Sequence, residues 1–131
     1  MAEIKPGLMG ELSIAVTEQM TANALGSGLA DVLATPYLVA LMEGAACKAL
    51  EGILLPELGS VGTMVQIYHT APTPVGMKVT AKACLENVDG RRLMFSVEAW
   101  DEKELVGEGK HERFVVNSQS FQEKADGKIN A

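Results

Sequence analysis

The chain has 131 residues, a net charge of −6 and an apolar content of 47%, which predicts a single domain with a hydrophobic core of its own. The acidic balance disfavours nucleic acid and anionic membrane surfaces as partners, and the longest apolar stretch, residues 36–50, is too short to span a bilayer. The N-terminal segment MAEIKPGLMG lacks the basic and apolar regions of a signal peptide, so we expect a cytoplasmic location.

The first elements that the sequence predicts are a strand and a long helix. Apolar residues alternate with polar ones from Leu8 to Thr17, as in a half-buried strand. The small residues that follow, with glycines at 26 and 28, predict a loop with at most one short helical turn. Thr35 and Pro36 predict a helix start, as N-cap and first helical residue, and the helix should end near residues 51–52. Because it is apolar on nearly all sides, we expect it to be enclosed.

Four more strands are predicted after this helix, each with one apolar face. The first ends at His69, and its predicted inward face comprises Val61, Thr63, Val65, Ile67 and His69. The next two meet at an Asp-Gly turn and should point inward Met77, Val79, Ala81, Ala83, Leu85, Leu93, Phe95, Val97 and Ala99. The last runs from about Leu105 to Asn117, and the polar residues after it should be frayed.

This order of elements predicts an α+β protein with a hotdog fold, in which a five-stranded antiparallel sheet wraps around one long central helix. We expect one domain over residues 1–117 and a polar C-terminal tail over residues 118–131. A helix this apolar needs more cover than one sheet provides. A homodimer with the two sheets joined edge to edge is therefore expected, and a tetramer of two dimers is left open.

Two polar residues stand in apolar surroundings: Glu43 within the predicted helix and His69 at the end of the next strand. Burying either group is costly unless it is paired or used. A carboxylate facing an imidazole is a common arrangement for acid–base chemistry near neutral pH, so each residue is a candidate partner for the other. The structural alternatives are a satisfied carboxylate, even one paired across a dimer interface, an ordinary strand-end histidine, and a plain N-cap at Thr35.

The two cysteines do not make a disulfide framework. We expect Cys47 in the helix and Cys84 in a strand to be packed small hydrophobes rather than a redox pair. Two histidines without a neighbouring cysteine provide no zinc ligand set, so neither a metal nor a cofactor is expected.

Four segments together resemble the fluoroacetyl-CoA thioesterase branch of the hotdog superfamily: ATPYLVALMEGAAC, GSVGTMVQIYHTAPTPVG, NVDGRRL and GEGKHERFVV. The likeness extends over about residues 9–116. In that branch the catalytic group is a threonine at the helix start, a glutamate eight residues further on and a histidine at the end of the next strand. These match Thr35, Glu43 and His69. The resemblance implies a homodimeric acyl-CoA thioesterase.

The resemblance also implies substrate-binding residues. The family's glycine, whose amide holds the thioester carbonyl, matches Gly62, and an arginine near the site matches Arg113. Taken alone, Gly62 fits a bulge or a loop equally well. One feature departs from the family, because Gly26 and Leu29 stand where phenylalanines form an aromatic lid. We therefore expect Leu29 to line a pocket that does not select fluoroacetyl groups.

The implied chemistry is hydrolysis of a small acyl-CoA thioester. The Gly62 amide would polarise the carbonyl, and Glu43 would be general base or nucleophile. His69 would protonate the sulfur or orient the glutamate, and Thr35 would position water. Surface cations are needed for the coenzyme phosphates, and the candidates are Arg91, Arg92, Lys110 and Arg113.

Two other functions are compatible with the same fold. A non-catalytic acyl-CoA-binding or sensing domain would keep the groove without needing both Glu43 and His69, and an enoyl-thioester hydratase would need an Asp/His motif that is not found. The sequence leaves open which acyl group is bound and whether the carrier is coenzyme A or a carrier protein.

Overall fold

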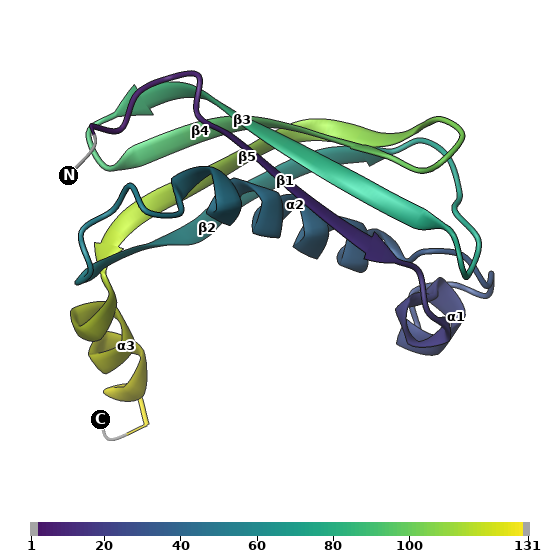
Figure 1. Cartoon of the computed structure of the whole chain (residues 1–131). Helices are drawn as coiled ribbons and strands as arrows, with labels where there is room; N and C mark the ends of the chain where they lie inside the picture. Colours follow the sequence, from purple (N-terminus) through teal and green to yellow (C-terminus); the bar gives the residue numbers. More distant parts are fainter. Residues whose placement is uncertain (1–2, 130–131) are drawn as a thin grey trace.

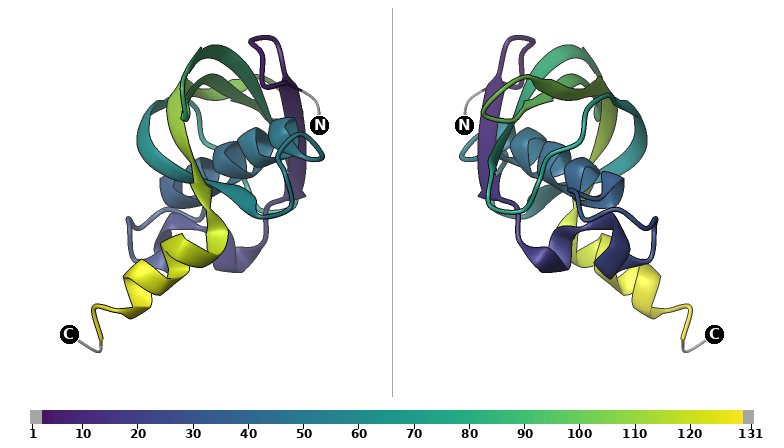
Figure 2. Two further views of the ribbon diagram at one scale, coloured as in Figure 1. Left: turned by 90° about the vertical axis from the view of Figure 1, so that its left-hand side faces the viewer. Right: turned by 90° about the vertical axis from the view of Figure 1, so that its right-hand side faces the viewer.

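A single curled antiparallel sheet forms the body of the protein, and one helix lies along its inner face (Figure 1). The computed structural model describes residues 3–129. The strands are β1 (Met9–Ala15), β2 (Leu58–His69), β3 (Lys78–Asp89), β4 (Arg92–Trp100) and β5 (Leu105–Asn117). They lie in the order β1-β3-β4-β5-β2, with every neighbouring pair antiparallel. The predicted α+β class and five-stranded antiparallel sheet are confirmed, and the views along the sheet show it curving around the helix (Figure 2).

The central helix α2 spans Thr35–Leu50 and starts one residue earlier than predicted. Its N-cap is Ala34, whose extended backbone (φ −71, ψ 142) precedes the first turn. Thr35 is thus the first helical residue rather than the cap, and its hydroxyl is engaged elsewhere. Pro36 lies in the first turn, where its missing N–H removes no helical hydrogen bond. The helix ends as predicted, with Glu51 as C-cap.

The inner face of the sheet carries the core, and the alternation predicted for β3 and β4 is confirmed by their buried residues. The helix adds Leu38, Leu41, Met42, Ala45, Ala46, Ala49 and Leu50. Its other side is not covered by the sheet of its own chain, and Cys47 is exposed there. The expectation that Cys47 is packed is therefore wrong, because one sheet covers only one side of a helix.

A β-bulge in β2 determines which of its residues face α2. The register of β2 against β5 shifts between Gly62 and Met64. Gly62 lies opposite Arg113, and Val65 lies opposite His111. Both of these β5 residues are buried on the inner side of the sheet. The extra residue in the bulge thus turns Gly62 towards the helix.

The same bulge corrects the predicted inward face of β2. Thr63 was expected to face the helix, but its hydroxyl donates to the Glu112 carboxylate at 2.6 Å on the outer side. Val61 lies opposite Phe114, which is 39% exposed, and it too faces outward. A strict alternation cannot hold across a strand that contains an extra residue.

Three short helical segments lie at the ends of the molecule. The stretch before α2 contains a 3₁₀ turn (Glu18–Met20) and α1 (Ala22–Leu25). The C-terminal segment forms α3 (Ser118–Asp126), capped by the side chain of Asn117, where we expected a frayed tail. It buries no residue and projects away from the sheet (Figures 1 and 2). Within residues 3–129, no helix is long and apolar enough to cross a membrane.

The contact between α2 and β1 depends on Gly10. A Cβ at this position would lie 2.1 Å from the Ala45 carbonyl oxygen and 2.3 Å from the Ala49 nitrogen. Because both are backbone atoms that cannot swing aside, we expect Gly10→Ala to lower the free energy of unfolding by at least about 1–3 kcal/mol. Chemical denaturation measures this change. Gly28→Ala is the control, since its Cβ would meet only the Ala22 Cβ at 3.5 Å. Equal stability of the two variants would contradict the close packing.

Candidate active site

The structure pairs two of the predicted site residues at the start of α2. The Thr35 hydroxyl lies 2.7 Å from Nδ1 of His69, at the end of β2. The other ring nitrogen of His69, Nε2, is buried and has no hydrogen-bond partner among the described residues. Burial lowers the pKa of His69 below its usual 6.5, against an opposing effect of the Ala71 backbone. The imidazole is therefore neutral near pH 7, and its two nitrogens differ: Nδ1 contacts Thr35, while Nε2 lacks a partner among the described residues.

This Thr35–His69 pair forms part of the wall of a cavity of about 310 Å³. The cavity is lined by Ala22, Ser27, Val32, Leu33, Thr35, His69, Thr70, Ala71 and Pro72. Its volume is at the lower end of that of small-molecule sites. No aromatic side chain stands in the lining apart from the imidazole. Leu29 is 93% exposed and lies outside the lining, so the structure does not bring it to the cavity.

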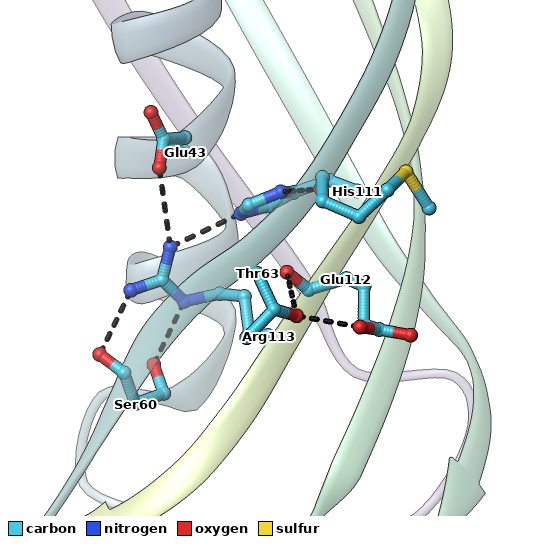
Figure 3. A network of polar contacts seen from close by, with 7 residues as sticks. Glu43, Ser60, Thr63, His111, Glu112 and Arg113 are labelled. Carbon is cyan, nitrogen blue, oxygen red and sulfur yellow. Dashed lines mark hydrogen bonds and ion pairs between the residues drawn. The ribbon is translucent and has the colours of Figure 1, made fainter.

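Glu43 lies two helical turns further along α2, against the inner face of β2. Its Oε2 is 3.8 Å from Nη1 of Arg113 (Figure 3). A Cβ on Gly62 would lie 2.7 Å from the same oxygen. The carboxylate can therefore approach the strand only because residue 62 has no side chain. We expected its charge to be answered by His69, Thr35 or a second subunit, and instead Arg113 of the same chain lies beside it.

Arg113 is held by three further contacts. Its Nε donates to the Ser60 hydroxyl at 2.8 Å and its Nη2 to the Ser60 carbonyl at 2.9 Å. Its Nη1 lies 3.0 Å from Nε2 of His111. Because a guanidinium can only donate, Nε2 of His111 accepts, and Nδ1 carries the hydrogen that is donated to the Met64 carbonyl at 2.9 Å. We call Glu43, Gly62, Ser60, His111 and Arg113 the Glu43 cluster.

Sequence reasoning identified Glu43, Gly62 and Arg113 but missed Ser60 and His111. The alternation of β5 carried a signal for His111, because residues two apart on a strand share a face and Arg113 was already a candidate. Ser60 gave no signal, since a serine at the start of a strand is unremarkable. The register of β2 against β5 brings these residues together.

The Thr35–His69 pair and the Glu43 cluster lie apart within one chain. Thr35 and Glu43 are separated by about 12 Å along the helix axis. His69 and Gly62 lie at the two ends of a stretch of β2 about 23 Å long. The structure therefore brings Thr35 to His69 and Glu43 to Gly62, and it does not join the two sets.

The cations proposed for coenzyme phosphates differ in availability. Arg92 forms an ion pair with Glu112 on the outer face of the sheet. Arg113 is only 6% exposed and its donors are used within the Glu43 cluster. Arg91 and Lys110 are exposed.

Comparison with known proteins gives consistent matches. A family model described as fluoroacetyl-CoA-specific thioesterase (FlK) matches residues 16–119. A curated fluoroacetyl-CoA thioesterase from Streptantibioticus cattleyicolor is 43% identical over 101 residues, which cover 77% of this chain and 73% of that protein.

Solved structures agree with the sequence match. A single-residue mutant of the fluoroacetyl-CoA-specific thioesterase FlK superposes with a TM-score of 0.91 at 34% identity, covering 98% of this chain and 99% of that one. A thioesterase superfamily member from Thermus thermophilus superposes with a TM-score of 0.87 at 27% identity, covering 99% and 98%. These matches confirm the predicted hotdog fold and the predicted family resemblance.

The stability of the protein should depend on its two histidines in a window around and below pH 6.5. Burial is the largest cause that lowers the pKa of both His69 and His111 below 6.5. The unfolded chain therefore binds protons more readily, and stability is lost as the pH falls through 6.5 towards the lower folded values. The lowered pKa values of Asp101 and Glu112 act only at lower pH, below their ordinary 3.8 and 4.5.

Urea denaturation at several pH values measures this dependence. The control is the double variant His69→Gln/His111→Gln, which should lose most of the slope in this window. A double variant with the same slope as the original protein would assign the effect to other groups.

Proposed function

This chain belongs to the fluoroacetyl-CoA-specific thioesterase family, and from that membership we propose that it hydrolyses small acyl-CoA thioesters through Thr35, Glu43 and His69. The enzyme class and the fold follow from the family itself: the protein is a thioester hydrolase with the hotdog fold. The catalytic residues rest on one observation above all, the contact of Thr35 with His69 on the wall of a cavity.

We propose that a homodimer completes the active site. β2 is an edge strand, and Val65 and Tyr68 on it are 37% and 65% exposed. An antiparallel pairing of β2 with its copy, about a two-fold axis near Val65, would put His69 of one copy beside Gly62 of the other. The Thr35–His69 pair would then face the Glu43 of the other copy. The same pairing covers an unprotected sheet edge.

In such a composite site each residue has a distinct task. The Gly62 amide polarises the thioester carbonyl, with no side chain in the way. Glu43, held by Arg113, activates water or attacks the carbonyl itself. The neutral His69 orients the attacking group or passes a proton to the leaving sulfur, and Thr35 fixes its ring. Neutral histidine near pH 7 suits this task, because it can both accept and donate a proton.

The cavity supports a small acyl group as substrate. Its volume of about 310 Å³ leaves room for a short chain. Leu29 would add an aliphatic wall if the segment that carries it and Ser27 closes over the bound acyl group. The exposed Arg91 and Lys110 are the remaining candidates for the phosphates of coenzyme A.

A non-catalytic acyl-CoA-binding domain is the alternative, and the family does not favour it. Such a domain would not require a carboxylate that lies beside both a glycine and an arginine on the inner face of the sheet. The panel measurement below separates the two functions.

We expect the purified protein to release free thiol from a panel of short, branched and aromatic acyl-CoAs. Glu43→Gln keeps the shape of the side chain but removes its basicity, so kcat should fall by about a hundredfold or more. His69→Ala should lower kcat strongly as well. Melting temperatures of both variants serve as the control for folding. Binding of acyl-CoA without thiol release by the original protein would favour the sensing domain, and a fully active Glu43→Gln would show that Glu43 is structural.

Mixing the two inactive variants tests the shared site. If His69 and Glu43 of one site come from different copies, a heterodimer of Glu43→Gln with His69→Ala contains one intact site. Unfolding and refolding an equal mixture should then restore activity to about a quarter of that of the original protein, by random pairing of subunits. Activity that stays at the level of the separate variants would place both residues of a site in one chain.

The missing aromatic lid predicts low selectivity for fluorine. With glycine and leucine in place of phenylalanines, kcat/KM for fluoroacetyl-CoA should lie within about tenfold of that for acetyl-CoA, as expected for a small change in an aliphatic pocket. Steady-state kinetics with both substrates measures the ratio. A ratio in the thousands would show that another part of the pocket recognises fluorine.

A further inference from the structure

His111 is a buried imidazole with both ring nitrogens engaged. It is 1% exposed and lies on β5 between the bulge of β2 and the guanidinium of Arg113. Nδ1 donates to the Met64 carbonyl, and Nε2 accepts from Arg113 (Figure 3). We propose that His111 is a positioning residue for thioester hydrolysis, which holds Arg113 against Glu43 and fixes the bulge that presents Gly62. This inference rests on the proposed function.

The contacts of His111 link the two features on which Glu43 depends. One is the bulge, whose register shift lies between Gly62 and Met64. His111 bonds the Met64 carbonyl on one side of this shift, and Arg113 lies opposite Gly62 on the other. The ring also approaches Gly62 directly, because a Cβ there would lie 3.2 Å from Cε1 of His111. A displaced His111 would therefore move both Gly62 and Arg113.

A core position filled only for packing would not need an imidazole. Burying a polar ring costs free energy unless each nitrogen is bonded, and an apolar side chain of similar volume would avoid that cost. The ring stacks on Phe95 with centroids 6.3 Å apart, a contact that an apolar residue could replace. The two hydrogen bonds to Met64 and Arg113 cannot be replaced in this way. They are the property that distinguishes histidine here.

The bonding pattern requires His111 to be neutral. Arg113 offers only donors, so a protonated ring would place N–H against N–H. The charged groups that face the ring are Arg113 on its own strand and Glu43 on α2. β2 presents the backbone of Gly62 and Met64, and β4 presents Phe95, none of which titrates. Burial lowers the pKa of His111 and keeps the ring neutral near pH 7.

Three substitutions separate the two bonds from the packing. Gln carries an amide oxygen near the position of Nε2 and can accept from Arg113. Asn carries an amide nitrogen near the position of Nδ1 and can donate to Met64, but it cannot reach Arg113. Leu retains only volume. All three are compared with Val97→Ala, a buried core change whose strand partners are Gly109 on β5 and Ala83 on β3.

We expect His111→Leu to lower kcat by about tenfold to a hundredfold with little change in KM, because misplacement of a catalytic group affects mainly the transition state. His111→Gln and His111→Asn, which each keep one of the two bonds, should each recover part of the lost rate. Val97→Ala should lose stability without losing kcat when assayed well below its melting temperature. A folded His111→Leu that turns over like the original protein, or a His111→Gln no better than Leu, would overturn the positioning role.

A measurement independent of turnover separates this inference from the proposed function. The ¹⁵N shifts of the imidazole report which ring nitrogen carries the hydrogen, and they should show Nδ1–H with a bare Nε2 in His111. Arg113→Leu should disturb this tautomer. If the protein hydrolyses no thioester but retains the tautomer, the proposed function fails, while the hydrogen bond from Arg113 to His111 is supported. A hydrogen on Nε2 would contradict this hydrogen bond and the positioning role, whatever the activity.

Discussion

The approach of the Glu43 carboxylate to the inner face of β2 is the contact around which this molecule is organised. The Glu43 side chain is 39% exposed, so water and the Arg113 guanidinium 3.8 Å away together stabilise its charge. Gly62 leaves room for the carboxylate oxygens beside the strand. Gly62 is in place because the bulge turns residue 62 inward. Ser60 and His111 in turn fix the arginine. The carboxylate, the glycine, the bulge and the buried donors thus form one connected set of contacts.

The two polar groups of α2 that are candidates for catalysis, Thr35 and Glu43, contact different parts of the sheet. Thr35 at one end contacts His69, while Glu43 lies about 12 Å further along the helix axis, beside Gly62 on β2 and Arg113 on β5. The free edge of β2 runs between these two positions. The uncovered side of the helix, where Cys47 is exposed, lies open as well. Both features are what a chain would show if its chemistry and its remaining burial were completed by a second copy.

The regular alternation of apolar and polar residues along the strands was predicted from the sequence, and the irregularities in that alternation were missed. Strand β3 alternates regularly from Val79 to Leu85 and β4 from Leu93 to Ala99, so the inward residues of these stretches were identified correctly. The bulge in β2 could not be seen, because Thr63 is compatible with either face of a strand. The partner of Glu43 was missed since Arg113 lies on β5, and only the strand register brings it near.

Local signals were also misjudged where a long-range contact competes with them. Threonine is a favoured N-cap residue, yet the hydroxyl of Thr35 bonds His69, and Ala34 occupies the N-cap position. Conversely, α3 was dismissed because its residues are polar, although Asn117 is a strong N-cap and good helix formers follow. Polarity argues against burial and not against a helix.

Since one helix carries both Thr35 and Glu43, α2 sets the distance between the two proposed catalytic residues. Adding a single residue between them would turn Glu43 by about 100° around the axis and advance it by about 1.5 Å. The carboxylate would then face away from Gly62 and Arg113, although every residue of the site was still present. The number of residues between Thr35 and Glu43 is therefore as important to the proposed chemistry as the two residues themselves.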